Sequence, residues 1–86
     1  VNIKKLENTL KDEYSKSRFV KILKTNSSLS TNDVINTNNC SIVICKTKYK
    51  NRVIILSAID NLIKGGAGQA IQNMNLKFNF PENKGL

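Results

Sequence analysis

The stretch of this sequence with the most unusual spacing is a lysine followed closely by three glycines. Gly65, Gly66 and Gly68 fall in the first turns of a predicted helix, where each costs about 0.5 to 1 kcal/mol relative to alanine. Such a cost is expected where another group must approach the backbone closely. Two groups qualify: an anionic ligand on the N–H groups of the helix start, or a second backbone packed tightly. The glycines alone favour packing, whereas Lys64, at the positive end of the helix, favours an anion.

Other residues that could do chemistry are few. The 86 residues contain no histidine and two cysteines, which excludes a Ser–His or Cys–His pair and an imidazole metal ligand within this chain. Cys40 and Cys45 lack the two-residue spacing of redox and zinc motifs. In an extended strand they would lie about 16 Å apart, which is too far for a disulfide. We therefore expect two buried, reduced thiols in a cytoplasmic type of protein, no metal site and no self-sufficient enzyme.

The net charge of +8, from 14 Lys and Arg against 6 Asp and Glu, makes nucleic acid a partner to consider. Four basic residues share one parity at the tip of a predicted hairpin: Lys46, Lys48, Lys50 and Arg52. Only Tyr49 is interleaved for stacking on a base, and no nucleic-acid-binding motif is present, so a solvated basic face is favoured. A free-standing basic module with weak, salt-sensitive nucleic-acid affinity is the alternative hypothesis. The apolar run Val53 to Leu56 is far shorter than a membrane span, so no membrane partner is expected.

The spacing of apolar residues predicts the elements that position these groups. Over about residues 3–16, apolar residues recur at intervals of three and four, which predicts an amphipathic helix: Ile3, Leu6, Leu10 and Tyr14. Residues 19–23 are rich in β-formers and predict a strand, and the polar residues 25–33 predict a loop.

Two further apolar runs, residues 40–45 and 53–59, flank a polar turn and predict an antiparallel β-hairpin. In that turn Asn51 is expected to tolerate a positive φ. The second run is apolar at nearly every position, which is typical of a strand covered on both faces. Two helices from so short a chain could cover one face but hardly both, so we expect the strand to meet another domain or another subunit.

A C-terminal helix over residues 60–78 completes the prediction. Asp60 or Asn61 can cap it, and an apolar stripe follows. The expected fold class is α+β, in the order helix, strand, long loop, antiparallel β-hairpin and C-terminal helix.

Residues 60–76, with the sequence DNLIKGGAGQAIQNMNL, closely resemble the C-terminal signature of the N-acetyl-gamma-glutamyl-phosphate reductase family, a family of semialdehyde dehydrogenases. Further resemblance to this family lies in three segments: residues 14–22, 34–42 and 78–86. Asn36 and Asn79 stand where the family usually has glycine, and asparagine best tolerates the left-handed backbone after glycine. Gly66 replaces a usual alanine. The resemblance covers nearly the whole chain, as the last quarter of a longer enzyme.

The resemblance implies that residues 1–86 are the C-terminal part of the α+β substrate and dimerisation domain of an NADP-dependent reductase. Such an enzyme converts N-acetyl-glutamyl 5-phosphate to N-acetyl-glutamate 5-semialdehyde in arginine biosynthesis. The implied partners are a missing N-terminal Rossmann domain, which binds most of the NADP, a small-molecule substrate and further copies in a homo-oligomer. Neither Cys40 nor Cys45 has the family's Ser-Asn-Pro-Gly-Cys context and the catalytic histidine is absent, so this chain alone is expected to be inactive.

The resemblance also assigns candidate site residues. In relatives the final helix packs back toward the nucleotide domain, which places residues 60–78 near the cofactor. Four residues are expected on this cofactor-facing edge: Asn61, Lys64, Gly65 and Gly66. Asn38 is expected on the wall of the active site. A third hypothesis, a dimerisation domain without contact to the cofactor, stays open at this point.

Overall fold

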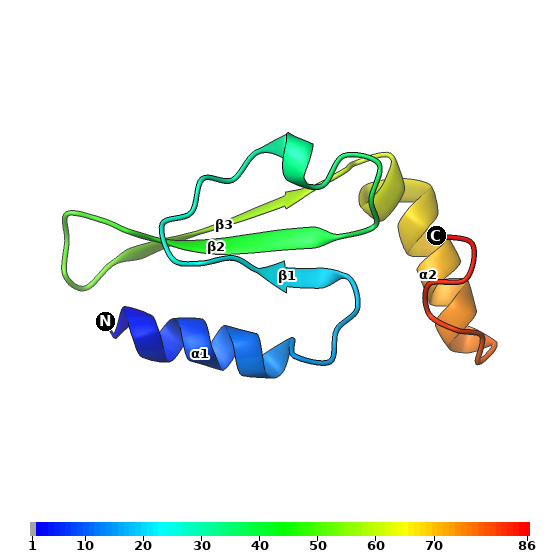
Figure 1. Cartoon of the computed structure of the whole chain (residues 1–86), viewed down its shortest axis with the longest axis horizontal. Helices are drawn as coiled ribbons and strands as arrows, with labels where there is room; N and C mark the ends of the chain where they lie inside the picture. The colour runs from blue at the N-terminus through cyan, green and yellow to red at the C-terminus, as the bar shows by residue number, and fades with distance from the viewer. Residues whose placement is uncertain (1) are drawn as a thin grey trace.

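The computed structural model describes residues 2–86, which form an α+β fold around a three-stranded sheet (Figure 1). The main elements are α1 (Ile3–Glu13), β1 (Val20–Ile22), β2 (Cys40–Lys46), β3 (Val53–Ile59) and α2 (Gly68–Lys77). The sheet has the order β1–β2–β3, with β1 parallel and β3 antiparallel to β2. The α+β class and the order of elements predicted from the sequence are confirmed.

Helix α1 is shorter than the predicted range of about residues 3–16. Side chains at the start and in the middle of the helix hold it in place. Asn2 Oδ1 accepts the N–H of Lys5 at 3.0 Å and caps the first turn. Glu7 is only 5% exposed, and its Oε1 accepts the N–H of Thr25 at 3.1 Å. This N–H holds the pKa of the Glu7 carboxyl below its ordinary value. A carboxylate therefore joins α1 to the loop that follows β1.

The hairpin of β2 and β3 has a continuous antiparallel register. Lys46 pairs with Val53 beside the turn, and Cys40 pairs with Ile59 at the far end of the hairpin. On its other side β2 pairs in parallel with β1, where Cys40 lies opposite Val20. The connection from β1 to β2 is the predicted polar loop, which contains a short 3₁₀ turn.

The turn of the hairpin is closed differently from the prediction. Among residues 2–86, the non-glycine residues with a positive φ are Asn26, Asn36 and Asn79, so the expectation for Asn51 is wrong. The Thr47 hydroxyl closes the turn by hydrogen bonds. Its oxygen accepts the N–H of Tyr49 and lies 3.0 Å from the carbonyl oxygen of Arg52. The left-handed conformations expected for Asn36 (φ 60°) and Asn79 (φ 59°) are confirmed.

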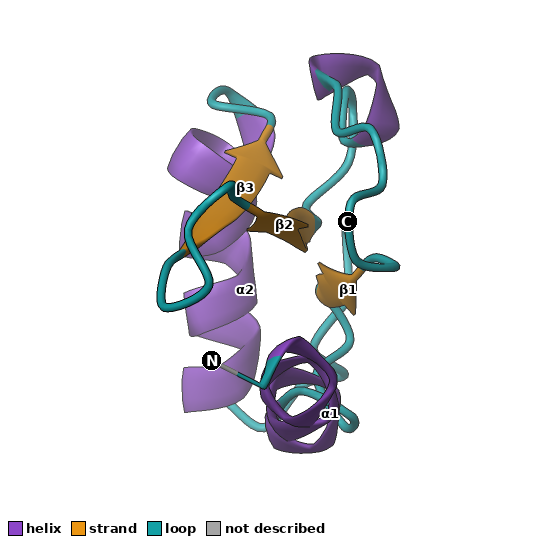
Figure 2. Cartoon of the chain, turned by 90° about the vertical axis from the view of Figure 1, so that its left-hand side faces the viewer, coloured by secondary structure: helices purple, strands orange, loops and turns teal. Residues whose placement is uncertain are grey.

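The described residues form an elongated body and not a sphere. α1 runs beside β1 and β2, whereas α2 lies beyond the end of the sheet (Figures 1 and 2). The radius of gyration is 14.6 Å, against roughly 12 Å for a compact chain of this length. The buried apolar core is correspondingly small: Phe19, Val34, Val43 and Ile44. No helix among residues 2–86 combines the length and the apolar character that crossing a bilayer would require.

β3 is a sheet edge with apolar side chains in solvent on both of its faces. Ile54 is 50% exposed and Ile55 is 53% exposed, and consecutive strand residues point to opposite faces. The sequence pattern of a doubly covered strand is therefore present, and residues 2–86 cover neither face. An edge of this kind favours pairing or packing with another segment.

The prediction of two buried thiols is wrong with respect to burial. Cys40 and Cys45 are both free, and each is only partly buried. They lie near the two ends of β2, and α2 does not pack over this strand (Figure 1).

We expect acidification to weaken this fold in part through Glu7. Its pKa is lower in the folded chain than its ordinary value of 4.5, so the carboxylate stabilises the fold above that value and the stabilisation is lost as the pH falls through the folded pKa. The Glu7→Gln variant should be less stable than the wild type at pH 7 and should lose less stability between pH 7 and pH 3. Urea unfolding followed by circular dichroism measures both. The exposed Glu13→Gln is the matched control, and equal pH dependence in all three proteins would contradict this role of Glu7.

Candidate functional site

A kinked turn connects β3 to α2 and carries most of the predicted site residues. Residues Ile63–Ala67 form a π-helical turn, within which Gly66 leaves helical geometry at φ −145° and ψ −117°. The predicted single helix over residues 60–78 is thus a kinked turn followed by α2. The apolar stripe in the sequence does not predict the break in the helix at Gly66.

Asp60 occupies the N–H groups at the start of this turn. Its Oδ1 accepts the N–H of Leu62 at 2.9 Å, and its carbonyl oxygen accepts the N–H groups of Ile63 and Gly65, each at 3.2 Å. These N–H groups already have partners within the chain, so the helix start does not offer them to an anionic ligand. The N-caps of the turn and of α2 are Leu62 and Ala67, neither with a side-chain cap, so neither Asp60 nor Asn61 is the N-cap residue that was expected.

The same carboxylate joins the kinked turn to the loop that precedes β2. Asp60 Oδ2 accepts the N–H of Asn36 at 2.8 Å. The N–H groups of Asn36 and then Leu62 hold the pKa of the Asp60 carboxyl below its ordinary value. The left-handed backbone at Asn36 is thus part of a contact between two segments that are 24 residues apart.

Gly68 shows what the glycines provide. Asn38 is 5% exposed, and its Oδ1 lies against the Gly68 backbone without a hydrogen-bond partner. A Cβ atom at position 68 would collide with that oxygen, and it would lie 2.6 Å from the carbonyl oxygen of Ile63 and 2.7 Å from Ile63 Cγ2. Close packing is therefore the reason for glycine here, although the group that approaches is a side chain as well as a backbone.

A hydrogen-bond network links Asn38 and Lys64, two of the predicted site residues. Gln72 Oε1 accepts from Asn38 Nδ2 at 2.8 Å and from Lys64 Nζ at 2.6 Å. The Lys64 ammonium also lies 5.5 Å from the centroid of the Phe19 ring, within the range of a cation–π contact. Gln72 Nε2 donates to Glu82 Oε2 at 2.8 Å, which brings the C-terminal tail into the network.

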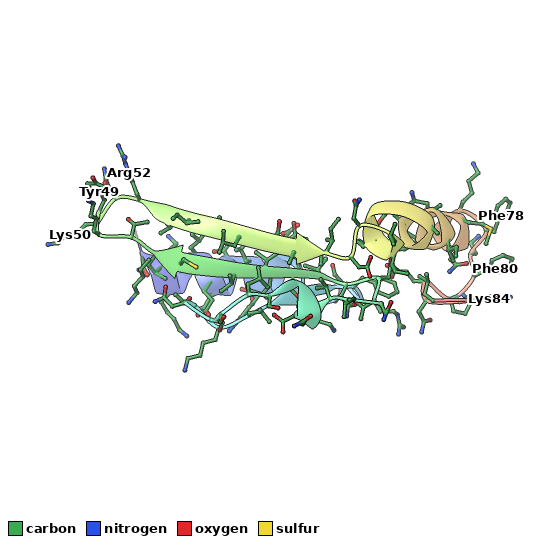
Figure 3. All side chains as sticks on the ribbon, turned by 90° about the horizontal axis from the view of Figure 1, so that it is seen from above. Tyr49, Lys50, Arg52, Phe78, Phe80 and Lys84 are labelled. Atoms are coloured by element: carbon green, nitrogen blue, oxygen red, sulfur yellow. The ribbon has the colours of Figure 1, made fainter. Side chains whose placement is uncertain are left out.

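The tail itself is held against α2 by a buried asparagine. Asn75 is fully buried, and its Nδ2 donates to the carbonyl oxygens of Glu82 and Lys84, both at 2.9 Å. Phe78 and Phe80 lie beyond this contact, in solvent at the end of the molecule opposite the hairpin tip (Figure 3). The position of Glu82 is therefore fixed by backbone contacts as well as by Gln72.

Asn36 borders two hollows. One has a volume of about 430 Å³, and Asn38, Phe19 and Gly68 are among its lining residues. The other has a volume of about 410 Å³ and is lined by Asn61 and Asp60, among others. Neither Cys40 nor Cys45 lines either hollow.

The predicted site residues are thus only partly brought together. Asn38 and Lys64 share one hydrogen-bond acceptor, whereas Asn61 faces the second hollow. Gly65 and Gly66 are exposed on the turn and line neither hollow. Among residues 2–86 there is no group of three or more His, Cys, Asp or Glu side chains that could hold a metal ion.

Sequence reasoning did not identify Gln72, although one signal was present. Gln72 follows Lys64 by eight residues and Gly68 by four, which puts the three on one face of a helix. A polar residue on the same face as a glycine packed by another segment is a candidate for contact with that segment. The other missed contact, from Asp60 to Asn36, has no local signature.

Comparison with known proteins places this chain in a family. Residues 1–61 match the family described as semialdehyde dehydrogenase, dimerisation domain. The chain belongs to this family. The match ends at Asn61, so the kinked turn and α2 follow the matched segment, and their similarity rests on individual relatives.

Those relatives cover the remaining residues too. The N-acetyl-gamma-glutamyl-phosphate reductase of Vesicomyosocius okutanii is 48% identical over all 86 residues, which are 24% of its length. The enzyme of the same name from Geotalea daltonii is 46% identical over 86 residues, 25% of its length. A probable chloroplastic N-acetyl-gamma-glutamyl-phosphate reductase of Oryza sativa is 44% identical over 77 residues, 90% of this chain and 19% of that protein. The chain spans about a quarter or less of the length of these curated relatives.

We expect Gly68→Ala to destabilise the chain by about 1–3 kcal/mol, because the added Cβ has no space between Ile63 and Asn38. The control is Gly66→Ala, where the Cβ would meet no atom closer than the Asn61 carbonyl oxygen at 3.4 Å. This control should change stability by less than about 0.5 kcal/mol. Urea unfolding measures both variants, and a harmless Gly68→Ala would refute the close packing of Asn38 against the helix.

Proposed function

We propose that this chain is the C-terminal part of an NADP-dependent N-acetyl-gamma-glutamyl-phosphate reductase, an oxidoreductase of arginine biosynthesis. The complete enzyme would convert N-acetyl-glutamyl 5-phosphate to N-acetyl-glutamate 5-semialdehyde. The observation that carries the proposal is the 48% identity over the whole chain to a relative of that name. One relative is named as chloroplastic, so the cytoplasmic location expected from the sequence stays a prediction.

The uncovered surfaces of the structure support an incomplete unit. β3 exposes apolar side chains on both faces, and the buried apolar core consists of four residues. A preceding part of about three times this length would supply the missing layers, because relatives are about four times as long as the chain. The match to a dimerisation domain adds a second copy of the chain as a further partner.

The surface of α2 supports a contact between residues 60–78 and the missing nucleotide-binding domain. Large apolar side chains are exposed along α2 and just after it: Met74, Leu76, Phe78 and Phe80. Exposed apolar side chains gathered at one end of an elongated body favour a packed partner. In the proposed enzyme that partner is the Rossmann domain, which binds most of the NADP.

The residues proposed for the cofactor rim fit a flat, polar group better than a phosphate. Asp60 already accepts the N–H groups of Leu62, Ile63 and Gly65, so these three are not available to a phosphate. Gly65 and Gly66 expose backbone without a Cβ, over which a flat ring can lie, and the exposed Asn61 carries an amide beside them. Lys64 keeps donors beyond the one that Gln72 uses. These residues would hold the cofactor ring, and a bound cofactor would supply the hydride chemistry.

The chemistry itself is proposed to reside in the preceding part of the enzyme. The chain has no histidine, and its two cysteines lie on β2 away from both hollows. Its own contribution is then the sheet, the interface, the cofactor rim and, through Asn38, a wall of the active site. The nucleic-acid alternative gains no support from the hairpin tip, because the Tyr49 ring already has the cations of Lys48 and Arg52 within 5.3 and 5.2 Å of its centroid.

Reconstitution tests the proposed function directly. The purified chain is mixed with a polypeptide that contains the preceding three-quarters of the enzyme, and NADP- and phosphate-dependent oxidation of N-acetyl-glutamate semialdehyde is followed by absorbance. We expect activity from the mixture and none from either part. An inactive mixture would contradict the proposed function, and activity of the 86-residue chain alone would show that the missing cysteine and histidine are not required.

Gly65→Ala tests the cofactor rim. The added Cβ would lie 2.6 Å from Asn61 Oδ1, so the Asn61 amide must move. Loss of one hydrogen bond to the cofactor is worth about 1 kcal/mol, so the KM for NADP of the completed enzyme should rise by roughly five- to tenfold. The exposed Ala70→Ser on α2 is the control. A lower melting temperature with an unchanged KM would instead support a dimerisation domain that does not contact the cofactor.

A further inference from the structure

Gln72 is the residue at which four segments of the chain meet. It lies in the middle of α2 and is half-buried. Its Oε1 accepts from Asn38 in the loop before β2 and from Lys64 in the kinked turn, and its Nε2 donates to Glu82 in the tail. Asn38, which is 34 positions from Gln72 in the sequence, is thereby held to the Gln72 side-chain amide.

The amide group is suited to this position by its charge and its bonding capacity. Lys64 offers an ammonium and Glu82 a carboxylate, so one partner requires an acceptor and the other a donor. An amide oxygen has two lone pairs, and the bonds from Asn38 and Lys64 use both. The two bonds with charged partners are the stronger kind. A methionine of similar length would satisfy none of these groups.

These bonds determine where two proposed site residues point. With its Nδ2 held by Gln72, the Asn38 amide turns its oxygen against Gly68, where that oxygen has no other partner. The Lys64 ammonium is held between Gln72 and the Phe19 ring. Phe19, Asn38 and Gly68 all line the 430 Å³ hollow. The orientation of polar groups at this hollow therefore depends on Gln72.

We propose that Gln72 is a positioning residue, which fixes Asn38 at the wall of the active site and Lys64 at the cofactor rim in the complete enzyme. This inference rests on the proposed function. Gln72 itself need not touch substrate or cofactor, since it acts through its two hydrogen-bond donors. A side chain held in one rotamer before the substrate arrives costs no ordering entropy during the reaction, whereas a misplaced group slows the chemistry.

Three variants of the reconstituted enzyme test the proposal. Gln72→Met removes all three bonds while it keeps a side chain of similar length. Gln72→Glu keeps the acceptor for Asn38 and Lys64 but sets a second carboxylate against Glu82. The double variant Gln72→Glu, Glu82→Gln restores all three bonds with the direction of one of them reversed, and it leaves the net charge unchanged. Gln69→Met is the control, because Gln69 bonds only with Asn73 on the exposed side of the same helix.

We expect Gln72→Met to lower kcat by about 10- to 100-fold, with a much smaller change in the KM for NADP, because a misplaced group costs about that much in rate. Gln72→Glu should fall between Gln72→Met and the wild type, because it keeps the acceptor for Asn38 and Lys64 but sets a carboxylate against Glu82. The double variant should return kcat close to the wild-type value, and Gln69→Met should leave it unchanged. An unaltered kcat in Gln72→Met, or a double variant as slow as Gln72→Met, would overturn the proposal.

A second measurement separates this proposal from the proposed function. In the isolated 86-residue chain, ¹⁵N NMR detects the side-chain amide of Asn38, which should shift and exchange faster with water in Gln72→Met and return in the double variant. If the wild-type mixture has no reductase activity but this signal behaves as expected, the proposed function fails and the positioning of Asn38 stands. If the amide signal does not respond to Gln72→Met, the positioning role is wrong whatever the activity.

Discussion

The contact between the loop before β2 and the kinked turn before α2 is polar, and the geometry of the candidate site depends on it. α2 lies beyond the end of the sheet, so the face of the sheet does not hold it in place (Figure 1). Asp60 and Gln72 do so instead, each with partners on both sides of the contact. Hydrogen bonds are directional, so they fix side-chain orientation more narrowly than apolar packing does. An end of the molecule held in this way has well-defined polar groups and a small core.

This arrangement leaves apolar surface that residues 2–86 do not bury. The residues form a single three-stranded sheet, in which β3 is an edge strand paired only with β2. At about 25 cal/mol per Å², the exposed isoleucines of β3 represent stabilisation that becomes available when another segment covers them. Stability and assembly are therefore linked in this chain, because a partner that covers the sheet also stabilises the strands from which the kinked turn begins.

The local elements could be predicted from the sequence, and the contacts between them could not. Apolar periodicity gave the amphipathic helix and the hairpin, and the family glycine positions gave the left-handed Asn36 and Asn79. The kink at Gly66 and the partners of Gln72 depend on segments far apart in the chain, which leave no period in the sequence. The burial of the two cysteines was wrongly predicted because it was inferred from the usual burial of free cysteine, whereas the actual burial depends on which segments pack against β2.

A segment without a nucleophile or a histidine can still set the rate of the proposed reaction. Transfer of hydride requires its two reacting atoms to be held at a fixed distance and angle, and an error of about 1 Å can cost a factor of about 100. Asn38 at the hollow and Lys64 in the kinked turn are held by one amide, and that amide is held by a tail which Asn75 fixes to α2. Through these hydrogen bonds, side-chain positions at the proposed active site are determined by a part of the enzyme that takes no part in the bond-making steps. This arrangement also explains why glycines that weaken a helix can be retained, because any larger residue at position 68 would push Asn38 out of this alignment.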